Sequence, residues 1–153
     1  MLQKSITAIG WREWLCLPEL GVATIKAKID TGARTSALHA FDVEEVKQGR
    51  KTVVHFKIHP LQRNNHKIIQ AKADLYDRRP VKDSGGQVTL RPVILTYMIL
   101  GHFIKPIELT LVNRDTMGFR MLLGRQALRP NLLVNPGRSF MLKTPKKKKI
   151  QSL

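Results

Sequence analysis

The sequence of 153 residues contains a single cysteine, Cys16, so one chain cannot form an internal disulfide or a cysteine-rich zinc site. It begins without an apolar run of signal-peptide length, and its longest apolar stretches, such as 93–101, are too short to span a bilayer. We therefore expect a protein of a reducing compartment, the cytoplasm, that has no membrane partner.

Acidic residues are scarce. The chain carries 11 Asp and Glu against 27 Lys and Arg, which gives a formal net charge of +16. A field of that sign attracts nucleic acid, an anionic membrane surface or an acidic polypeptide. Aromatic residues make up only 6% of the sequence, so platforms for stacking bases are few. The hydrophobic fraction of 42% is that of an ordinary globular domain.

No segment has a long 3.6-residue stripe, and apolar residues instead recur every second position. This alternation predicts strands at 24–29, 52–58, 93–100 and 107–112, with turn signals at 20–21, 48–50 and 113–118. Only 125–128, just before Pro130, suits a helix of one or two turns. The pattern predicts an all-β sandwich or barrel over residues 1–142, followed by a basic disordered tail at 143–153.

The turn with the clearest chemistry follows an apolar strand and reads Asp30, Thr31, Gly32, Ala33. A carboxylate at a buried strand end must be hydrogen-bonded or paired. Gly32 allows backbone N–H groups to approach it, and the Thr31 hydroxyl can brace the turn. The turn is of the kind that carries the catalytic carboxylate of an aspartic protease, and we predict Asp30, Thr31 and Gly32 as its catalytic residues.

Two later segments strengthen this interpretation. In retroviral aspartic proteases, an Asp-Thr-Gly-Ala turn is followed by an apolar-apolar-Gly-Arg segment that packs beneath it, and residues 121–125 of this chain resemble that segment. Between the two lies a glycine-rich hairpin, the flap, which closes over the substrate. The sequence Ser84-Gly85-Gly86 has the position and the turn chemistry of such a flap.

The resemblance extends to a bacterial retropepsin-like family that is labelled ATP-dependent zinc protease or RimK-associated protease. The similarity covers roughly residues 9–142 and is carried by 10–14, 28–40, 59–62, 77–79, 83–86, 91–94 and 113–128. It implies a closed retropepsin-like β-barrel with a flap hairpin and one short C-terminal helix, and peptidase activity. Some members are associated with an ATP-grasp ligase that adds glutamates to a ribosomal protein, which implies an acidic peptide or glutamylated protein as substrate.

The sequence contains no recognisable ATP-binding or zinc-binding motif. The chain lacks a glycine-rich Lys-Ser/Thr phosphate loop and a His-Glu-x-x-His sequence. His55 and His59 are four residues apart, but on a strand that spacing does not bring them together. We predict a metal-independent peptidase without a cofactor.

One departure from the retroviral pattern concerns the residue after the Asp-Thr-Gly-Ala turn. That residue is usually an acid that pairs with the arginine of the Gly-Arg step, whereas this chain has Arg34 and Arg125 at the two positions. Two arginines near the site would repel each other unless a negative charge lies between them. Either Asp115, Asp83 or Glu108 supplies that charge, or carboxylates of the substrate do, since guanidinium groups are well suited to binding carboxylates. The predicted substrate-binding residues are Arg34, Arg78, Arg79, Ser84, Gly85, Gly86 and Arg125.

Aspartic proteases use two carboxylates that share a proton, and this chain has one Asp-Thr-Gly turn. The simplest source of the second carboxylate is Asp30 of another copy in a two-fold homodimer. Asp83 is the weaker alternative, because it does not follow an apolar strand and its position fits the flap. The rival interpretation is a non-catalytic basic β module that contacts RNA or the ribosome through the +16 surface and the Lys146–Lys149 tail.

Overall fold

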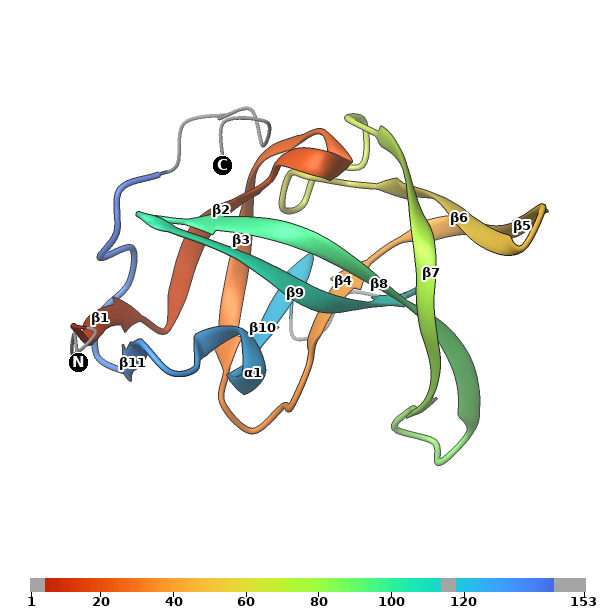
Figure 1. The fold of residues 1–153 in the computed structure, drawn as a ribbon. Helices are drawn as coiled ribbons and strands as arrows, with labels where there is room; N and C mark the ends of the chain where they lie inside the picture. The colour runs from red at the N-terminus through yellow and green to blue at the C-terminus, as the bar shows by residue number, and fades with distance from the viewer. Residues whose placement is uncertain (1–4, 114–117, 145–153) are drawn as a thin grey trace.

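A computed structural model describes residues 5–113 and 118–144. Of the predicted tail at 143–153, residues 145–153 lie outside the described residues, as does Asp115. The described part is mostly β-structure (Figure 1). Its strands are β1 (Thr7–Gly10), β2 (Arg12–Leu17), β3 (Val22–Asp30), β4 (Ser36–His39), β5 (Phe41–Gln48), β6 (Lys51–Ile58), β7 (Ile69–Lys82), β8 (Val88–Leu100), β9 (Phe103–Val112), β10 (Met121–Gly124) and β11 (Leu132–Asn135). The helical elements are the 3-10 turn η1 (Pro18–Leu20) and the helix α1 (Arg125–Leu128).

Six strands close into a barrel in the order β2-β3-β10-β4-β9-β8. The closing contact is the antiparallel pairing of β2 with β8, where Cys16 lies opposite Ile99. Strands β7, β6 and β5 continue the sheet beyond β8, and β1 pairs with β11 in a separate parallel ribbon. The expected closed barrel with one short C-terminal helix is therefore confirmed.

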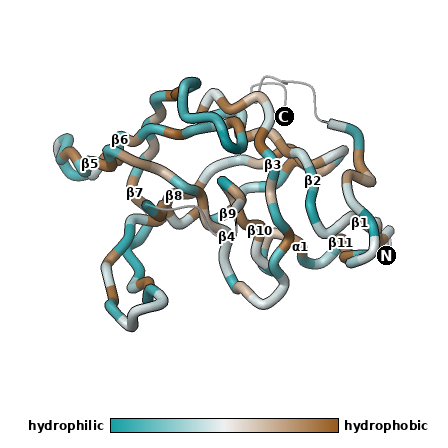
Figure 2. The backbone as a smooth tube through the Cα atoms, turned by 180° about the vertical axis from the view of Figure 1, so that it is seen from behind, coloured by the Kyte–Doolittle hydropathy of each residue, from teal (hydrophilic) through white to brown (hydrophobic). Residues whose placement is uncertain are grey.

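The alternation in the sequence sets which side chains enter the core. In β3, Ile25, Ala27 and Ile29 are buried, as their spacing predicts, while the residues between them are only half-buried. Figure 2 shows hydrophobic and hydrophilic residues alternating along the strands. None of the described helices is long and apolar enough to cross a membrane.

The two ends of the described chain are joined by a buried carboxylate. Glu13 is fully buried in β2, and its side chain accepts hydrogen bonds from the backbone N–H groups of Gly10, Met141 and Leu142, at 2.6, 2.9 and 3.2 Å. Because a buried carboxylate must be compensated, these bonds fix the segment after β11 against the start of the barrel.

Candidate active site

Asp30 is the last residue of β3, and its side chain is half-buried. The backbone N–H of Gly32 donates to Asp30 Oδ1 at 3.1 Å, and the N–H of Ala33 donates to the Asp30 carbonyl at 3.2 Å. Thr31 and Gly32 are exposed. The turn thus holds the carboxylate through its own backbone and leaves one side of it open to solvent.

Strand β10 locks this turn from below, as the resemblance implied. It runs between β3 and β4, the two strands that flank the Asp30 loop, and places Gly124 opposite Asp30. The N–H of Gly124 donates to the buried Ser36 hydroxyl at 3.0 Å. A Cβ atom at position 124 would lie 2.6 Å from the Thr35 carbonyl carbon and oxygen, so only glycine fits here.

Arg125 braces the same loop. Its Nη1 donates to the carbonyls of Gly32 at 3.1 Å and Thr31 at 3.4 Å, and its backbone N–H donates to Ala33 at 2.8 Å. The described contacts of this side chain are therefore with the Asp30 loop, and its predicted role in substrate binding stays a prediction. Carbonyl oxygens, rather than Asp83 or Glu108, compensate this guanidinium.

The predicted flap is the hairpin of β7 and β8, with Ser84, Gly85 and Gly86 at its exposed tip. The hairpin and the loop after β3 project from the same side of the barrel (Figure 1). At the tip, Gly86 has a φ of 86°, and the N–H of Gln87 donates to Asp83 Oδ1 at 2.9 Å. The Asp83 carboxylate thus closes the turn of the hairpin.

The two arginines of β7 pair with acids of the chain itself. Arg78 donates two hydrogen bonds to Glu45 Oε1 of β5, at 2.6 and 2.9 Å. Arg79 donates to Asp77 at 3.0 Å and forms a second ion pair with Glu108 of β9. The hydrogen bond to Glu108 is the main cause that raises the pKa of Arg79 above its already high value, so this side chain stays charged at every physiological pH.

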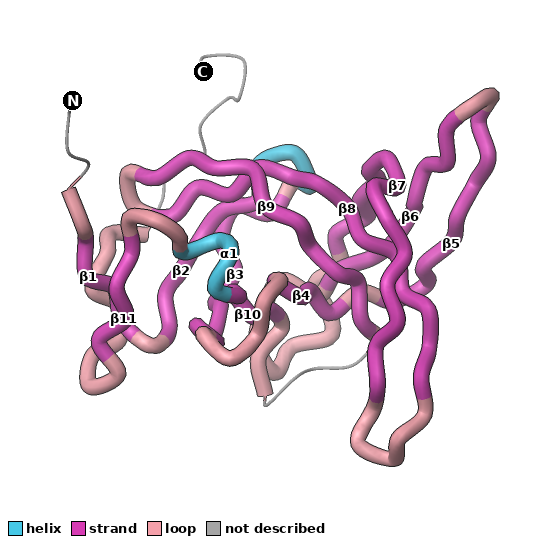
Figure 3. The backbone as a smooth tube through the Cα atoms, turned by 60° about the horizontal axis from the view of Figure 1, so that its bottom comes forward, coloured by secondary structure: helices cyan, strands magenta, loops and turns pink. Residues whose placement is uncertain are grey.

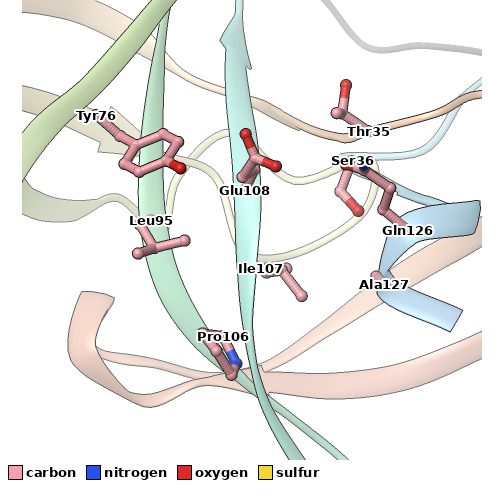
Figure 4. Close-up of a pocket in the computed structure, with 9 residues that line it drawn as sticks. All are labelled: Thr35, Ser36, Tyr76, Leu95, Pro106, Ile107, Glu108, Gln126 and Ala127. Atoms are coloured by element: carbon pink, nitrogen blue, oxygen red, sulfur yellow. The ribbon is translucent and has the colours of Figure 1, made fainter. Parts of the chain in front are cut away.

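A cavity of about 350 Å³ lies between the root of the hairpin and the Asp30 loop. In Figure 4, Tyr76 and Leu95 stand on one side, Thr35, Ser36 and Gln126 on the other, and Glu108, Ile107 and Pro106 between them on β9. A second cavity of about 230 Å³ is lined by Arg34, Thr35, Arg79, Glu108 and Gln126. Figure 3 shows α1, which supplies Gln126, beside β10.

The structure therefore brings some of the predicted site residues together and separates others. Arg34 and Arg79 line one cavity, next to the loop that carries Asp30. Arg78 points to β5 instead, and the glycines of the flap lie at the far end of the hairpin. Of the residues that line the cavities, sequence reasoning considered Glu108 only as a neutralising acid and did not identify Tyr76, Leu95 or Gln126.

The zinc named in the family label finds no fitting donor set among the described residues, where no cluster of three or more His, Cys, Asp or Glu side chains occurs. Two of the described histidines, His39 and His59, have ring centres 6.1 Å apart. The His59 ring stacks on Phe41, and Nδ1 of His39 faces Arg120 Nη1 at 3.4 Å. The described residues therefore do not fit a zinc ion, and no step of the reaction is assigned to a metal.

Comparison with known proteins places this site in context. The family profile described as "RimB-like: Retropepsin-like aspartic endopeptidase RimB" matches residues 8–145. A crystal structure of a protein of unknown function (DUF785) from Legionella pneumophila superposes with a TM-score of 0.73 at 27% identity, over 91% of this chain and all of the other.

Curated relatives bear a different name. Proteins called "Probable alpha-L-glutamate ligase" are 44% identical in Shewanella halifaxensis and 42% identical in Parasynechococcus marenigrum, in each case over 134 residues. The match covers 88% of this chain but 29% of each relative. The chain thus spans less than a third of the length of these relatives.

Proposed function

Because the chain belongs to the RimB-like family of retropepsin-like aspartic endopeptidases, we propose that it hydrolyses peptide bonds with Asp30. The observation that carries this proposal is the position of Asp30. Its carboxylate ends a core strand, is held by the Gly32 N–H, and lies in a loop that β10 locks from below. The neighbouring cavities, of about 350 and 230 Å³, supply room for substrate side chains beside this loop.

The proposed reaction needs two carboxylates that share one proton. The ionised carboxylate takes a proton from water, and the neutral one donates a proton to the carbonyl oxygen of the scissile bond. The water oxygen attacks the carbonyl carbon, which gives a tetrahedral intermediate with two hydroxyl groups. As its C–N bond breaks, the amine leaves with the proton that the first carboxylate took from water, and one hydroxyl returns a proton to the second carboxylate. Since Asp83 is engaged in the turn of the hairpin, we assign the second carboxylate to Asp30 of another copy in a two-fold homodimer.

We further propose that the substrate is acidic and rich in glutamate, such as a glutamylated protein tail. The formal charge of +16 and the arginines of the cleft support this substrate class. The relatives add a second argument, since their name assigns them to α-L-glutamate ligation. A peptidase domain within the same polypeptide as such a ligase would meet glutamate-bearing products directly.

The test compares Asp30→Asn and Asp83→Asn with the wild-type chain, using hexa-L-glutamate as substrate and hexa-L-glutamine as its neutral counterpart. We expect Asp30→Asn to reduce hydrolysis by about a thousandfold or more without loss of fold by circular dichroism. Asp83→Asn keeps substantial activity. Full activity of Asp30→Asn would refute the carboxylate mechanism, as would inactivation by a chelator that added zinc reverses.

Ionic strength provides a second test of the substrate class. Each exposed contact between an arginine and a substrate carboxylate is weak, and salt screens it. The KM for hexa-L-glutamate should therefore rise steeply between low and high salt. Equal, salt-independent cleavage of the neutral peptide would show that the basic surface serves another partner.

The second candidate function is binding of RNA or the ribosome by this basic surface. One observation favours it, a cluster of cations and aromatic rings on β2, β3 and the residue before β2. The Arg12 guanidinium carbon lies 4.7 Å from the ring centre of Trp11, and Lys26 Nζ lies 5.9 Å from that of Trp14. However, Trp14 already stacks on Phe140 at 5.9 Å. Arg12→Ala should weaken binding of a labelled RNA oligonucleotide if this face binds RNA, and unchanged binding would exclude the face.

A further inference from the structure

Two of the cavities beside the Asp30 loop, those that Arg34 and Glu108 line, differ in chemical character and share a wall. The larger one presents the exposed apolar side chains of Tyr76 and Leu95, together with Pro106. The smaller one presents the guanidinium groups of Arg34 and Arg79. Thr35, Glu108 and Gln126 line both cavities, so the apolar and the cationic compartments are adjacent.

The charges of the smaller cavity are not equally available. Arg34 is exposed, and among residues 5–113 and 118–144 its side chain has no hydrogen bond or ion pair. Arg79 is held on both sides by Asp77 and Glu108. The Glu108 side chain is 25% exposed and its partner Arg79 is 33% exposed, so water and a ligand can both reach this pair.

We propose that these compartments together bind one glutamate side chain of the substrate, and that Glu108 competes with the substrate carboxylate for Arg79. The methylene groups of the bound glutamate lie against Leu95 and Pro106, and its carboxylate reaches Arg34. Glu108 then acts as a specificity-determining residue, because it places a negative charge where the substrate brings its own. This inference rests on the proposed function for its substrate class.

The arrangement of charges in the smaller cavity explains why a competing carboxylate, that of Glu108, is useful there. Arg34 and Arg79 line one cavity, where two guanidinium groups repel each other, and Glu108 adds to the compensation that Asp77 gives Arg79. The Arg79–Glu108 ion pair also weakens the binding of an acidic product. A substrate or product carboxylate that binds Arg79 must displace Glu108, so the new ion pair replaces one that already existed. Glu108 thus lowers affinity for acidic side chains and favours release after cleavage.

The experiment measures binding of fluorescein-labelled hexa-L-glutamate by anisotropy, with the full chain carrying Asp30→Asn so that no turnover interferes. In this background we expect Glu108→Gln to lower the Kd by about three- to tenfold. Arg34→Ala should raise the Kd by a similar factor. Labelled hexa-L-glutamine should bind all variants alike.

Asp42→Asn is the matched control, since it also removes one negative charge from an ion pair, here that of Asp42 with Lys57 at 3.0 Å between β5 and β6. It should change the Kd by less than about twofold. Equal or weaker binding of hexa-L-glutamate after Glu108→Gln would overturn the inference, as would an equal gain from Asp42→Asn or no binding at all.

The outcome is separable from that of the proposed function. If Glu108→Gln tightens binding but wild-type chain hydrolyses nothing, the peptidase proposal fails and the binding site stands. If wild-type chain cleaves hexa-L-glutamate in an Asp30-dependent way and Glu108→Gln has no effect on binding, only the role of Glu108 fails.

Discussion

The loop that carries Asp30 and the β7–β8 hairpin beside it are held by different kinds of contact. Backbone hydrogen bonds, the close approach of Gly124 to Thr35, and the bonds from Arg125 to carbonyl oxygens fix the loop. The hairpin is anchored at its root by the backbone ladders of β7 with β6 and of β8 with β9. Beyond these ladders its side chains reach other strands through ion pairs that are open to solvent, Arg78 with Glu45 and Arg79 with Glu108. The position of the acid therefore depends on steric fit, whereas the side-chain contacts of the projecting hairpin depend on charge.

This difference suits a peptidase site, in which the Asp30 loop must hold its carboxylate in a fixed position and the hairpin must move to let a peptide enter. Contacts that depend on steric fit are insensitive to salt, whereas exposed ion pairs weaken as salt screens them. Substitutions in the loop should consequently cost much more stability and activity than comparable substitutions in the hairpin.

The largest effect is expected from Gly124→Ala. The added Cβ would meet the Thr35 carbonyl at 2.6 Å and push the Asp30 loop away from β10. We expect a loss of about 3 kcal/mol in the free energy of unfolding and of most hydrolysis, with the Tm lower by roughly 10 °C. Thermal unfolding measures this. Gly137→Ala, where the Cβ would lie 3.5 Å from its nearest neighbour, is the control and should be nearly neutral.

Arg125→Ala comes next, because it removes the bonds to the Thr31 and Gly32 carbonyls. We expect kcat to fall about tenfold with little change in KM, together with a stability loss of about 1–2 kcal/mol. Arg125→Lys should recover part of this. A rise in KM at constant kcat would instead assign Arg125 to substrate binding.

A smaller effect is expected at the tip of the hairpin. Gly86 has a φ of 86°, where an L side chain is strained, so Gly86→Ala should destabilise the chain by about 1 kcal/mol in urea unfolding. Gly85→Ala tests the same turn without a positive φ, and its Cβ would lie 3.4 Å from Asp83. Equal losses for the two variants would show that backbone conformation is not the cause.

The smallest effect should follow Arg78→Ala, which breaks the exposed ion pair with Glu45. We expect a change of about 0.5 kcal/mol or less, and less still in 1 M salt. A loss comparable to that of Arg125→Ala would contradict the distinction between the two sides of the cleft.

The sequence predicts well what depends on neighbouring residues. Alternation places Val54, Phe56 and Ile58 on one face of β6, and all three are buried. The Asp30 turn and the flap are recognisable because their glycines follow local backbone requirements. By contrast, period-two alternation says which face a side chain takes but not which strand lies beside it. Alternation alone could not predict the closure of β2 on β8 for that reason, and the closed barrel was expected from the family resemblance instead.

The charged residues of the site were less predictable. The pair Arg78-Arg79 reads as a free basic patch in the sequence, whereas the structure pairs Arg78 with Glu45 and Arg79 with Glu108, which are 33 and 29 residues away. A count of charges does not reveal such pairings, because they depend on strand order. The alternation of 107–112 does place Glu108 on the face opposite Ile107 and Leu109, which was the available signal.

The most direct test of the central claim, that each chain supplies one half of an Asp30 dyad, is a mixing experiment. Wild-type chain is equilibrated with a threefold excess of Asp30→Asn chain, and hydrolysis of hexa-L-glutamate is measured per wild-type chain. Random exchange leaves about one wild-type chain in four paired with another, so the account predicts that activity falls to roughly a quarter. Activity that stays unchanged in the mixture, with a wild-type sample that sediments as a monomer, would contradict it.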